Sequence, residues 1–164
     1  MPRHPPGTLV LGIDPGTAVT GYGALAPLER GRWTLVECGV IRTSAGSPLP
    51  ERIREIYEEV AGLVERFRPA AMAVEDVFQG RNVRSALTLG HARGAILLAG
   101  ALRGVPVAEY TPAEIKSAVV GHGRATKDQV AYMVQRHLRL REAPAPADAA
   151  DGVAAALCHC LVGP

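Results

Sequence analysis

The chain has 164 residues, a mass of 17.3 kDa, 48% hydrophobic residues and a formal net charge of +2. This length predicts a single domain over residues 1–164 that buries its own core without disulfides. No apolar run approaches the roughly 18 residues of a membrane span, and the first residues lack a signal-peptide core, so we expect a cytoplasmic protein with no membrane partner. The mild charge leaves nucleic-acid binding open, because that binding depends on where basic residues lie.

Three apolar, β-branched segments open the chain, over residues 8–14, 20–26 and 33–41. Short turns rich in Gly, Pro and charge join them, which predicts an antiparallel meander. The first segment is the most continuously apolar, so we expect it to be central in the sheet. A loop then leads to residues 50–68, where apolar residues recur every three to four positions, as in an amphipathic helix.

The second half of the chain alternates short apolar runs with helical patterns. The expected elements are a strand over 70–76, a loop over 77–82, a helix over 83–102, a strand over 105–110, a helix from Thr111, a helix from Thr126 to about Leu138, and a final helix over 148–161. Thr111, Pro112 and Glu114 combine an N-cap, a proline at the first helical position and a capping-box glutamate. This order predicts an α/β fold of the ribonuclease H-like kind, with an antiparallel meander, then parallel strands, in a mixed sheet flanked by helices.

Four carboxylates are candidates for one catalytic site. Asp14 ends the first strand, Glu75 ends the strand after the first helix, and Asp148 and Asp151 lie three apart on one helical face. If the two strands are neighbours, all four acids meet at one end of the sheet, where only cations would offset their repulsion. Oxygen ligands suit Mg²⁺ or Mn²⁺, and two such ions about 3.5–4 Å apart favour phosphodiester hydrolysis.

Each acid also has a structural interpretation. Asp14 could be a turn residue, and Glu75 could be a solvated strand end. Asp148 could be the N-cap of the last helix, and Asp151 a partner of the helix dipole. The neighbouring Asp76 should point to the face opposite Glu75 if the strand persists. The coincidence of four acids favours catalysis over these separate explanations.

Basic and aromatic residues accompany the acids. Phe78 follows the acidic strand end in an expected loop, where it could stack on an unpaired base or pack in the core. Candidate phosphate contacts lie in the nearby loops and helix starts: Arg81, Arg84, Lys116, Arg124 and Lys127. Each of these cations alone could equally be a solvated surface charge. The helix over 83–102 is apolar around much of its circumference, which suggests a twofold interface or extensive internal packing.

Four blocks of the sequence together resemble one known family. They are "LGIDPGTAVTGYG", "AVEDVFQGRNVRSALTLGHARGA", "VAEYTPAEIKSAVVGHGRATKDQV" and "ADAADGVAAALCHC". In order and spacing they are similar to the bacterial RuvC family of Holliday junction resolvases, over about residues 9–161. Asp76 departs from the resemblance, because family members often have glutamine there.

The resemblance implies a homodimeric, Mg²⁺-dependent endonuclease that makes paired symmetric nicks in four-way DNA junctions during recombination and repair. The family's catalytic acids fall on Asp14, Glu75, Asp148 and Asp151. Its phosphate-contacting lysines fall on Lys116 and Lys127, and its aromatic residue near the junction centre on Phe78. The implied partners are the RuvA and RuvB branch-migration proteins.

Three other functions deserve comparison. The turn after Asp14 also resembles the first phosphate loop of actin-like and sugar-kinase ATPases, but those proteins need a duplicated domain and this chain has no repeat. A non-catalytic module for branched DNA would not need four acids that repel phosphate. A nuclease of the same fold acting on structured RNA fits the acids equally well, and only the extended resemblance to junction resolvases disfavours it.

Overall fold

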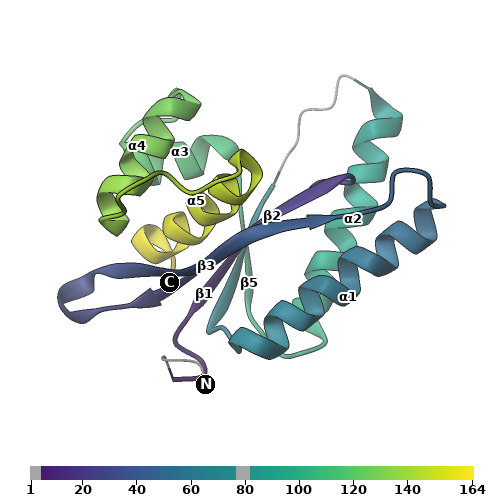
Figure 1. The fold of residues 1–164 in the computed structure, drawn as a ribbon, viewed down its shortest axis with the longest axis horizontal. Coiled ribbons are helices and arrows are strands. Elements are labelled where there is room, and N and C mark those ends of the chain that lie inside the picture. Colours follow the sequence, from purple (N-terminus) through teal and green to yellow (C-terminus); the bar gives the residue numbers. More distant parts are fainter. Residues whose placement is uncertain (1–4, 77–81) are drawn as a thin grey trace.

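The computed structural model describes residues 5–76 and 82–164. Its five strands form one sheet in the order β3-β2-β1-β4-β5. In chain order the elements are β1 (Val10–Asp14), β2 (Val19–Pro27), a 3-10 turn (Glu29–Gly31), β3 (Trp33–Arg42), α1 (Leu49–Phe67), β4 (Ala71–Glu75), α2 (Val83–Ala101), β5 (Val107–Tyr110), α3 (Pro112–Val120), α4 (Lys127–Leu138) and α5 (Ala147–Val162). Figure 1 shows these elements around the sheet.

The sheet confirms the predicted ribonuclease H-like fold class. β1 pairs antiparallel with β2, and β2 with β3, whereas β1–β4 and β4–β5 are parallel. β1 is the middle strand, as its continuous apolar sequence predicts. Because β1 and β4 run in the same direction side by side, Asp14 and Glu75 end their strands at the same edge.

Helices cover both faces of the sheet (Figure 1). On one face, α1 and α2 pack bulky aliphatic residues against the sheet, including Ile56, Val60, Val64 and Ile96. On the other face, α5 lies against β1 and β2, and α3 and α4 pack outside it. None of the helices in the described part of the chain is long and apolar enough to cross a membrane.

Local sequence explains the helix starts near the site. The Thr111 hydroxyl accepts from the Glu114 N–H at 3.2 Å, and the Glu114 carboxylate accepts from the Thr111 N–H at 2.7 Å. Thr126 and Gln129 make the same reciprocal pair at the start of α4. The two capping boxes fix the residues at which α3 and α4 begin.

The start of the last helix differs from the alternative in which Asp148 is its N-cap. α5 begins at Ala147, and the capping position is Pro146, which has no side-chain hydrogen bond to the helix. Asp148 therefore lies in the first turn of the helix. Because the Asp148 carboxylate does not cap the helix, it is available to the site.

Candidate active site

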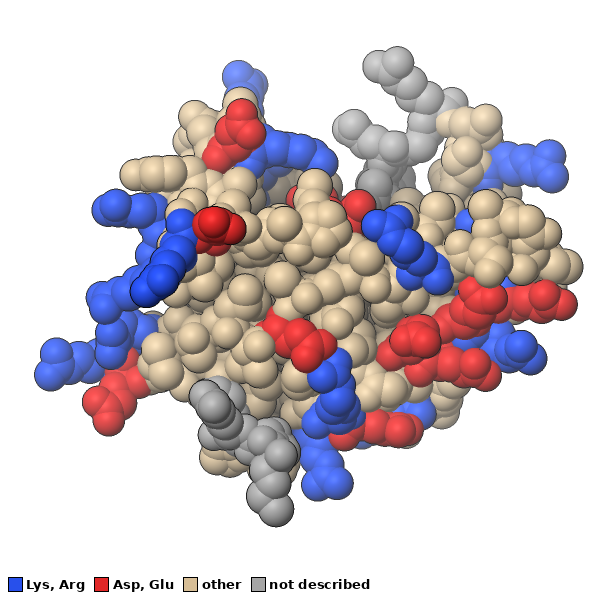
Figure 2. Space-filling model, in the orientation of Figure 1, with Lys and Arg blue, Asp and Glu red and all other residues tan. Residues whose placement is uncertain are grey.

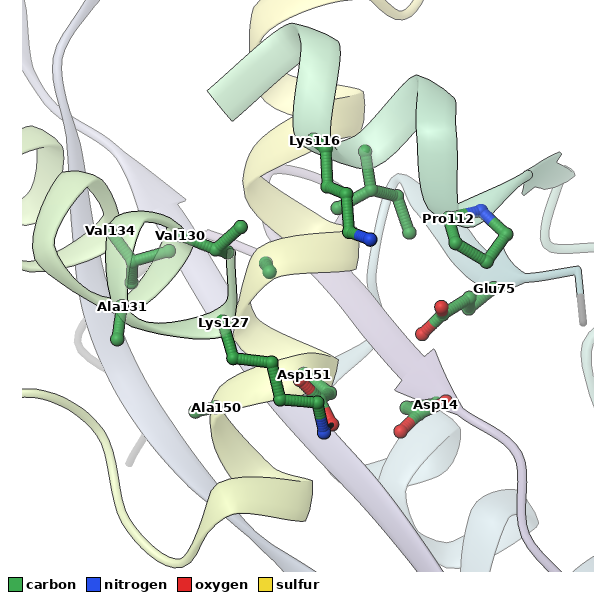
Figure 3. A pocket seen from close by; sticks show the side chains of 12 residues that line it. Asp14, Glu75, Pro112, Lys116, Lys127, Val130, Ala131, Val134, Ala150 and Asp151 are labelled. Atoms are coloured by element: carbon green, nitrogen blue, oxygen red, sulfur yellow. Dashed lines mark ion pairs between the residues drawn. The ribbon is translucent and has the colours of Figure 1, made fainter. Parts of the chain in front are cut away.

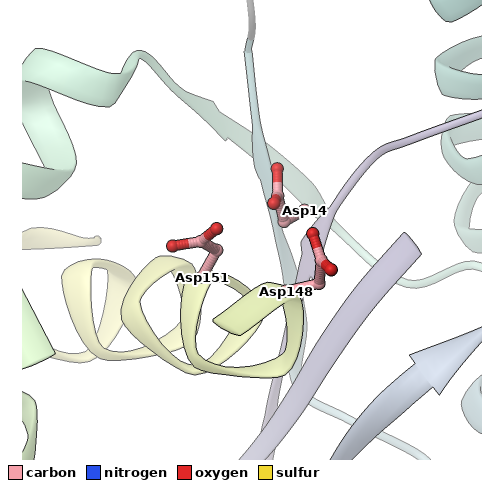
Figure 4. Close-up of side chains that lie close together, drawn as sticks. All are labelled: Asp14, Asp148 and Asp151. Atoms are coloured by element: carbon pink, nitrogen blue, oxygen red, sulfur yellow. The ribbon is translucent and has the colours of Figure 1, made fainter. Parts of the chain in front are cut away.

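The acid cluster is built from two strand ends and one helix. Asp14 comes from β1, Glu75 from β4, and Asp148 and Asp151 from the first turns of α5. Ligand oxygens of Asp14, Asp148 and Asp151 all lie within 4.8 Å of one another. Figure 4 shows these three side chains turned toward a common space. Glu75, on the adjacent strand β4, lines the same cavity as Asp14 and Asp151 (Figure 3), so the fold places all four predicted acids in one region.

Close approach of α5 to the sheet brings the acids together, and glycines permit it. A Cβ at Gly21 of β2 would fall 1.7 Å from the carbonyl oxygen of Asp148. A Cβ at Gly12 would fall 2.1 Å from the carbonyl oxygen of Gly152, and one at Gly152 would fall 2.6 Å from the Cα of Tyr22. Any side chain at these three positions would force α5 away from the strands. Sequence reasoning missed this requirement, although the glycine-rich pattern of β1 and β2 was its visible signal.

The turn after Asp14 is held by a buried threonine. The Thr20 hydroxyl is fully buried, donates to the Gly16 carbonyl at 2.9 Å and accepts from the Gly16 N–H at 3.2 Å. A Cβ on Gly16 would fall 2.0 Å from the Val19 carbonyl oxygen, so the turn also requires glycine there. These two hydrogen bonds satisfy polar groups of the turn within the turn itself. The turn therefore fixes the end of β1 and the position of Asp14.

Burial and mutual repulsion perturb the acids strongly. Burial, followed by the neighbouring carboxylates, raises the pKa of Asp14 to about 9. A protonated Asp14 donates a hydrogen bond to Glu75, whose own pKa burial raises above its usual value. Burial likewise raises the pKa of Asp151, partly offset by Lys127. These shifts favour a protonated carboxyl group among the acids when no cation is bound.

The donor set fits a hard divalent cation. Carboxylate oxygens from Asp14, Asp148 and Asp151 converge, and Glu75 adds a fourth carboxyl group to the same cavity. Mg²⁺ and Mn²⁺ prefer such all-oxygen ligands, and a positive ion would replace the proton that now relieves repulsion. These four residues can hold divalent metal.

Two lysines border the acids. Lys116 of α3 and Lys127 of α4 line the same cavity, and Figure 3 shows both side chains directed toward it. The Lys127 Nζ lies 3.7 Å from the Asp151 carboxylate, and its side chain is 84% exposed. An exposed pair of this kind stabilises the fold little, which leaves Lys127 free to contact a substrate phosphate.

The remaining predicted DNA contacts lie outside this cavity. Arg84 is exposed in the first turn of α2, and Arg124 is exposed in the loop between α3 and α4. Neither lines the cavity that holds the acids. Phe78 and Arg81 lie outside the described residues, so their assignments stay predictions.

Asp76 is not a free charge beside the site. Its carboxylate lies 3.5 Å from Arg93 of α2, and the same guanidinium pairs with Glu109 of β5. Its backbone N–H donates to the Tyr110 carbonyl at 2.7 Å. The Arg93 side chain is 17% exposed, whereas those of Asp76 and Glu109 are 39% and 45% exposed, so water reaches the carboxylate side of both pairs. Sequence reasoning did not identify Arg93, since 17 positions separate it from Asp76.

The chain matches the family model of the crossover junction endodeoxyribonuclease RuvC over residues 10–159. The protein of that description from Pelotomaculum thermopropionicum is 52% identical over 151 residues, which cover 92% of each chain. Its counterpart from Moorella thermoacetica is 50% identical, over 95% of this chain and 93% of the relative.

Solved structures agree with the sequence relatives. Thermus thermophilus RuvC, solved in complex with a Holliday junction substrate, superimposes with a TM-score of 0.88 at 42% identity, over 94% of this chain and 93% of that one. The yeast mitochondrial Holliday junction resolvase Ydc2 shares the fold, with a TM-score of 0.69 at 13% identity. With the family model matched over most of its length and relatives at half identity, this chain belongs to the RuvC family of crossover junction endodeoxyribonucleases.

Proposed function

We propose that the protein is a metal-dependent endonuclease that resolves four-way DNA junctions by paired, symmetric nicks. The observation that carries this proposal is a cavity lined by Asp14, Glu75, Asp151 and two lysines, with Asp148 close to Asp14 and Asp151. Family membership supports the same activity, and one nuclease domain over residues 1–164 would contain it.

Asp14, Glu75, Asp148 and Asp151 would hold the metal, which we take to be two Mg²⁺ ions with Mn²⁺ as a substitute. When bound, the ions supply an activated water and stabilise the leaving oxygen of the phosphodiester. Lys116 and Lys127 would hold the phosphate of the cut strand above the acids.

Charge on the surface supports an approach of DNA from the side of α3 and α4. Figure 2 shows Lys and Arg side chains projecting along the left edge, over α4 and the turn between β2 and β3. Over α1, acidic and basic side chains alternate. A phosphate backbone is attracted by the first surface and not by the second. Arg84 and Arg124, with Phe78 and Arg81, would extend this contact.

We further propose a homodimer built on α2. Val83, Leu87, Leu98 and Leu102 on and just after this helix are between 50% and 76% exposed, which is unusual for large apolar side chains in one element. A twofold dimer would cover them and present two sites to a twofold-symmetric junction. RuvA and RuvB are the proposed partners that supply the junction.

The decisive experiment compares cleavage of end-labelled four-way junctions, linear duplex and structured RNA, with Mg²⁺ and with chelator. We expect symmetric, Mg²⁺-dependent nicks in the junction alone. Asp14→Asn should abolish cutting, by about 10²–10³-fold or more, while keeping junction affinity, because it removes a buried ligand and a negative charge. Glu59→Gln on the exposed face of α1 is the matched control and should cut normally.

Other outcomes identify the alternatives. Junction binding without cuts under any divalent metal would indicate a non-catalytic module. Preferential cutting of structured RNA would reassign the substrate. Loss of folding in Asp14→Asn, seen by circular dichroism, would show that Asp14 is structural.

A further inference from the structure

The cavity at the acids extends well beyond them. Its volume is about 330 Å³, and its walls come from three helices. Asp14, Glu75, Asp151 and the two lysines contribute the polar part of its lining, and its other lining residues are apolar: Pro112 and Ile115 of α3, Val130, Ala131 and Val134 of α4, and Ala150 and Ala154 of α5. Figure 3 shows Val130 directed from α4 toward the space beside Lys116.

Neither metal nor phosphate explains these apolar walls. Hydrated ions and phosphate oxygens need polar neighbours, which the acids and lysines already provide. An apolar hollow of this size with a few convergent polar groups is typical of a site for an organic ring. The occupant should therefore carry an anionic phosphate at the lysines and an aromatic ring a few bonds away, as a nucleotide does.

We propose that this cavity receives one nucleobase of the cut strand, turned out of its stack beside the scissile phosphate, and that Val130 limits which bases fit. The proposal rests on the proposed function, because it places the base of the same substrate at the same site. Contact of a base with these aliphatic walls would offset part of the cost of extrusion, which is lowest where pairing is already interrupted, as at a junction centre.

Val130 can set the size of the cavity with less cost to the fold than its neighbours, because it packs at the margin of the core and not inside it. It is only partly buried, whereas Ile115 and Val134 on the same walls are 5% and 1% exposed and belong to the core. A larger residue at Val130 should fill the cavity, and a smaller one should widen it. Val36, which is 40% exposed on β3, offers the same substitutions away from the site.

The test uses four-way junctions that carry the fluorescent base 2-aminopurine at single positions on either side of the cut. They are titrated with the full-length protein in chelator, so binding is measured without cutting. With the wild type, we expect a fluorescence change at one flanking position and little at the others. Val130→Phe should remove that change at saturating protein and lower affinity about fivefold or more, the scale of one lost base contact. Val36→Phe should behave as the wild type.

A second measurement tests size selection. With each of the four bases placed in turn at the responsive position, Val130→Ala should raise cleavage of purine-bearing junctions relative to pyrimidine-bearing ones, and Val130→Phe should flatten the preference. Melting followed by circular dichroism checks that each variant is folded, and Val130→Leu replaces Val130→Phe if the latter unfolds.

Two results would overturn the inference. One is an equal fluorescence response of the wild type and Val130→Phe at every position. The other is unchanged base preference in both Val130→Ala and the filling variant. A wild type that cuts junctions without a position-specific response removes only this inference, whereas a wild type that neither binds nor cuts junctions removes the proposed function.

Discussion

The two faces of the sheet are packed in different ways. The α1–α2 face uses large aliphatic side chains, such as Ile56 and Ile96, at ordinary distances from the strands. The α5 face also contains aliphatic side chains such as Val153 and Leu157, but there the backbone of the helix meets that of the strands at Gly12, Gly21 and Gly152. Large side chains can adjust to a change in neighbouring volume, but a backbone contact cannot. The backbone contacts of the second face therefore set the distances between the acids.

The largest effect should come from Gly21→Ala. The added Cβ meets the Asp148 carbonyl, so α5 must move away from β2. We expect a loss of about 3 kcal/mol in unfolding free energy and about 10²-fold in cleavage rate, since displacement of a reacting group by about 1 Å is that costly. Chemical denaturation and junction cleavage measure the two effects.

Gly62→Ala on α1 is the matched control for that variant. A Cβ at Gly62 has open space around it, and alanine is the better helix former. Stability should rise by about 0.5–1 kcal/mol, with cleavage unchanged. Equal losses of unfolding free energy and cleavage rate in Gly21→Ala and Gly62→Ala would contradict the distinction between the two faces of the sheet.

The pH dependence of the unfolding free energy should arise from the acid cluster on the α5 face. Burial and the neighbouring carboxylates raise the pKa of Asp14 from 3.8 in the unfolded chain to about 9 in the metal-free fold, so the folded state holds a proton that the unfolded chain releases. This contribution is complete below pH 3.8 and is lost as pH rises toward 9. In chelator, the melting temperature of Asp14→Asn should fall less between pH 5 and 9 than that of the wild type. An identical slope in both proteins would contradict this assignment.

Arg93 should matter next, because it ties α2 to the end of β4 beside the site. Arg93→Met leaves Asp76 and Glu109 without their shared partner and should lower unfolding free energy by about 1–3 kcal/mol. Arg54→Met breaks an exposed pair with Glu58, 69% and 63% exposed, and should cost about 0.5 kcal/mol or less. Urea denaturation measures the unfolding free energy of both variants. Similar losses would show that solvent screens the Arg93 pairs as strongly as the Arg54–Glu58 pair.

The smallest effect tests the bulky face. Ile96 is fully buried between α2 and the sheet, and Ile96→Val removes one methylene. We expect a loss of about 0.5–1.5 kcal/mol, measured by urea denaturation, with the cleavage rate of the folded protein unchanged. A large loss of rate without loss of stability would place Ile96 in the site's geometry.

Sequence predicted the fold and the four acids because both depend on local patterns. Alternation and apolar periodicity located the strands and helices within one or two residues at most ends, and Asp14 and Glu75 stood out as carboxylates that end apolar strands. The capping box at Thr111 was equally visible, since all of its members lie within four residues.

The remaining features depend on contacts between distant segments. The pairing of Asp76 with Arg93 and Glu109 needs three elements in place. Val130 looked like an ordinary apolar position of a helix, and only the packing of α3, α4 and α5 makes it a cavity wall. The interpretation of Asp148 as an N-cap was wrong because local sequence cannot distinguish a capping position from the first turn.

The contact of α5 with the glycines of β1 and β2 also makes the acid cluster depend on the last helix of the chain. Asp148 lies 134 positions after Asp14, and it reaches the other acids only when α5 packs against the sheet. A chain that ends before α5 lacks Asp148 and Asp151. The acid cluster is therefore complete only after the first and last elements of the fold have come together.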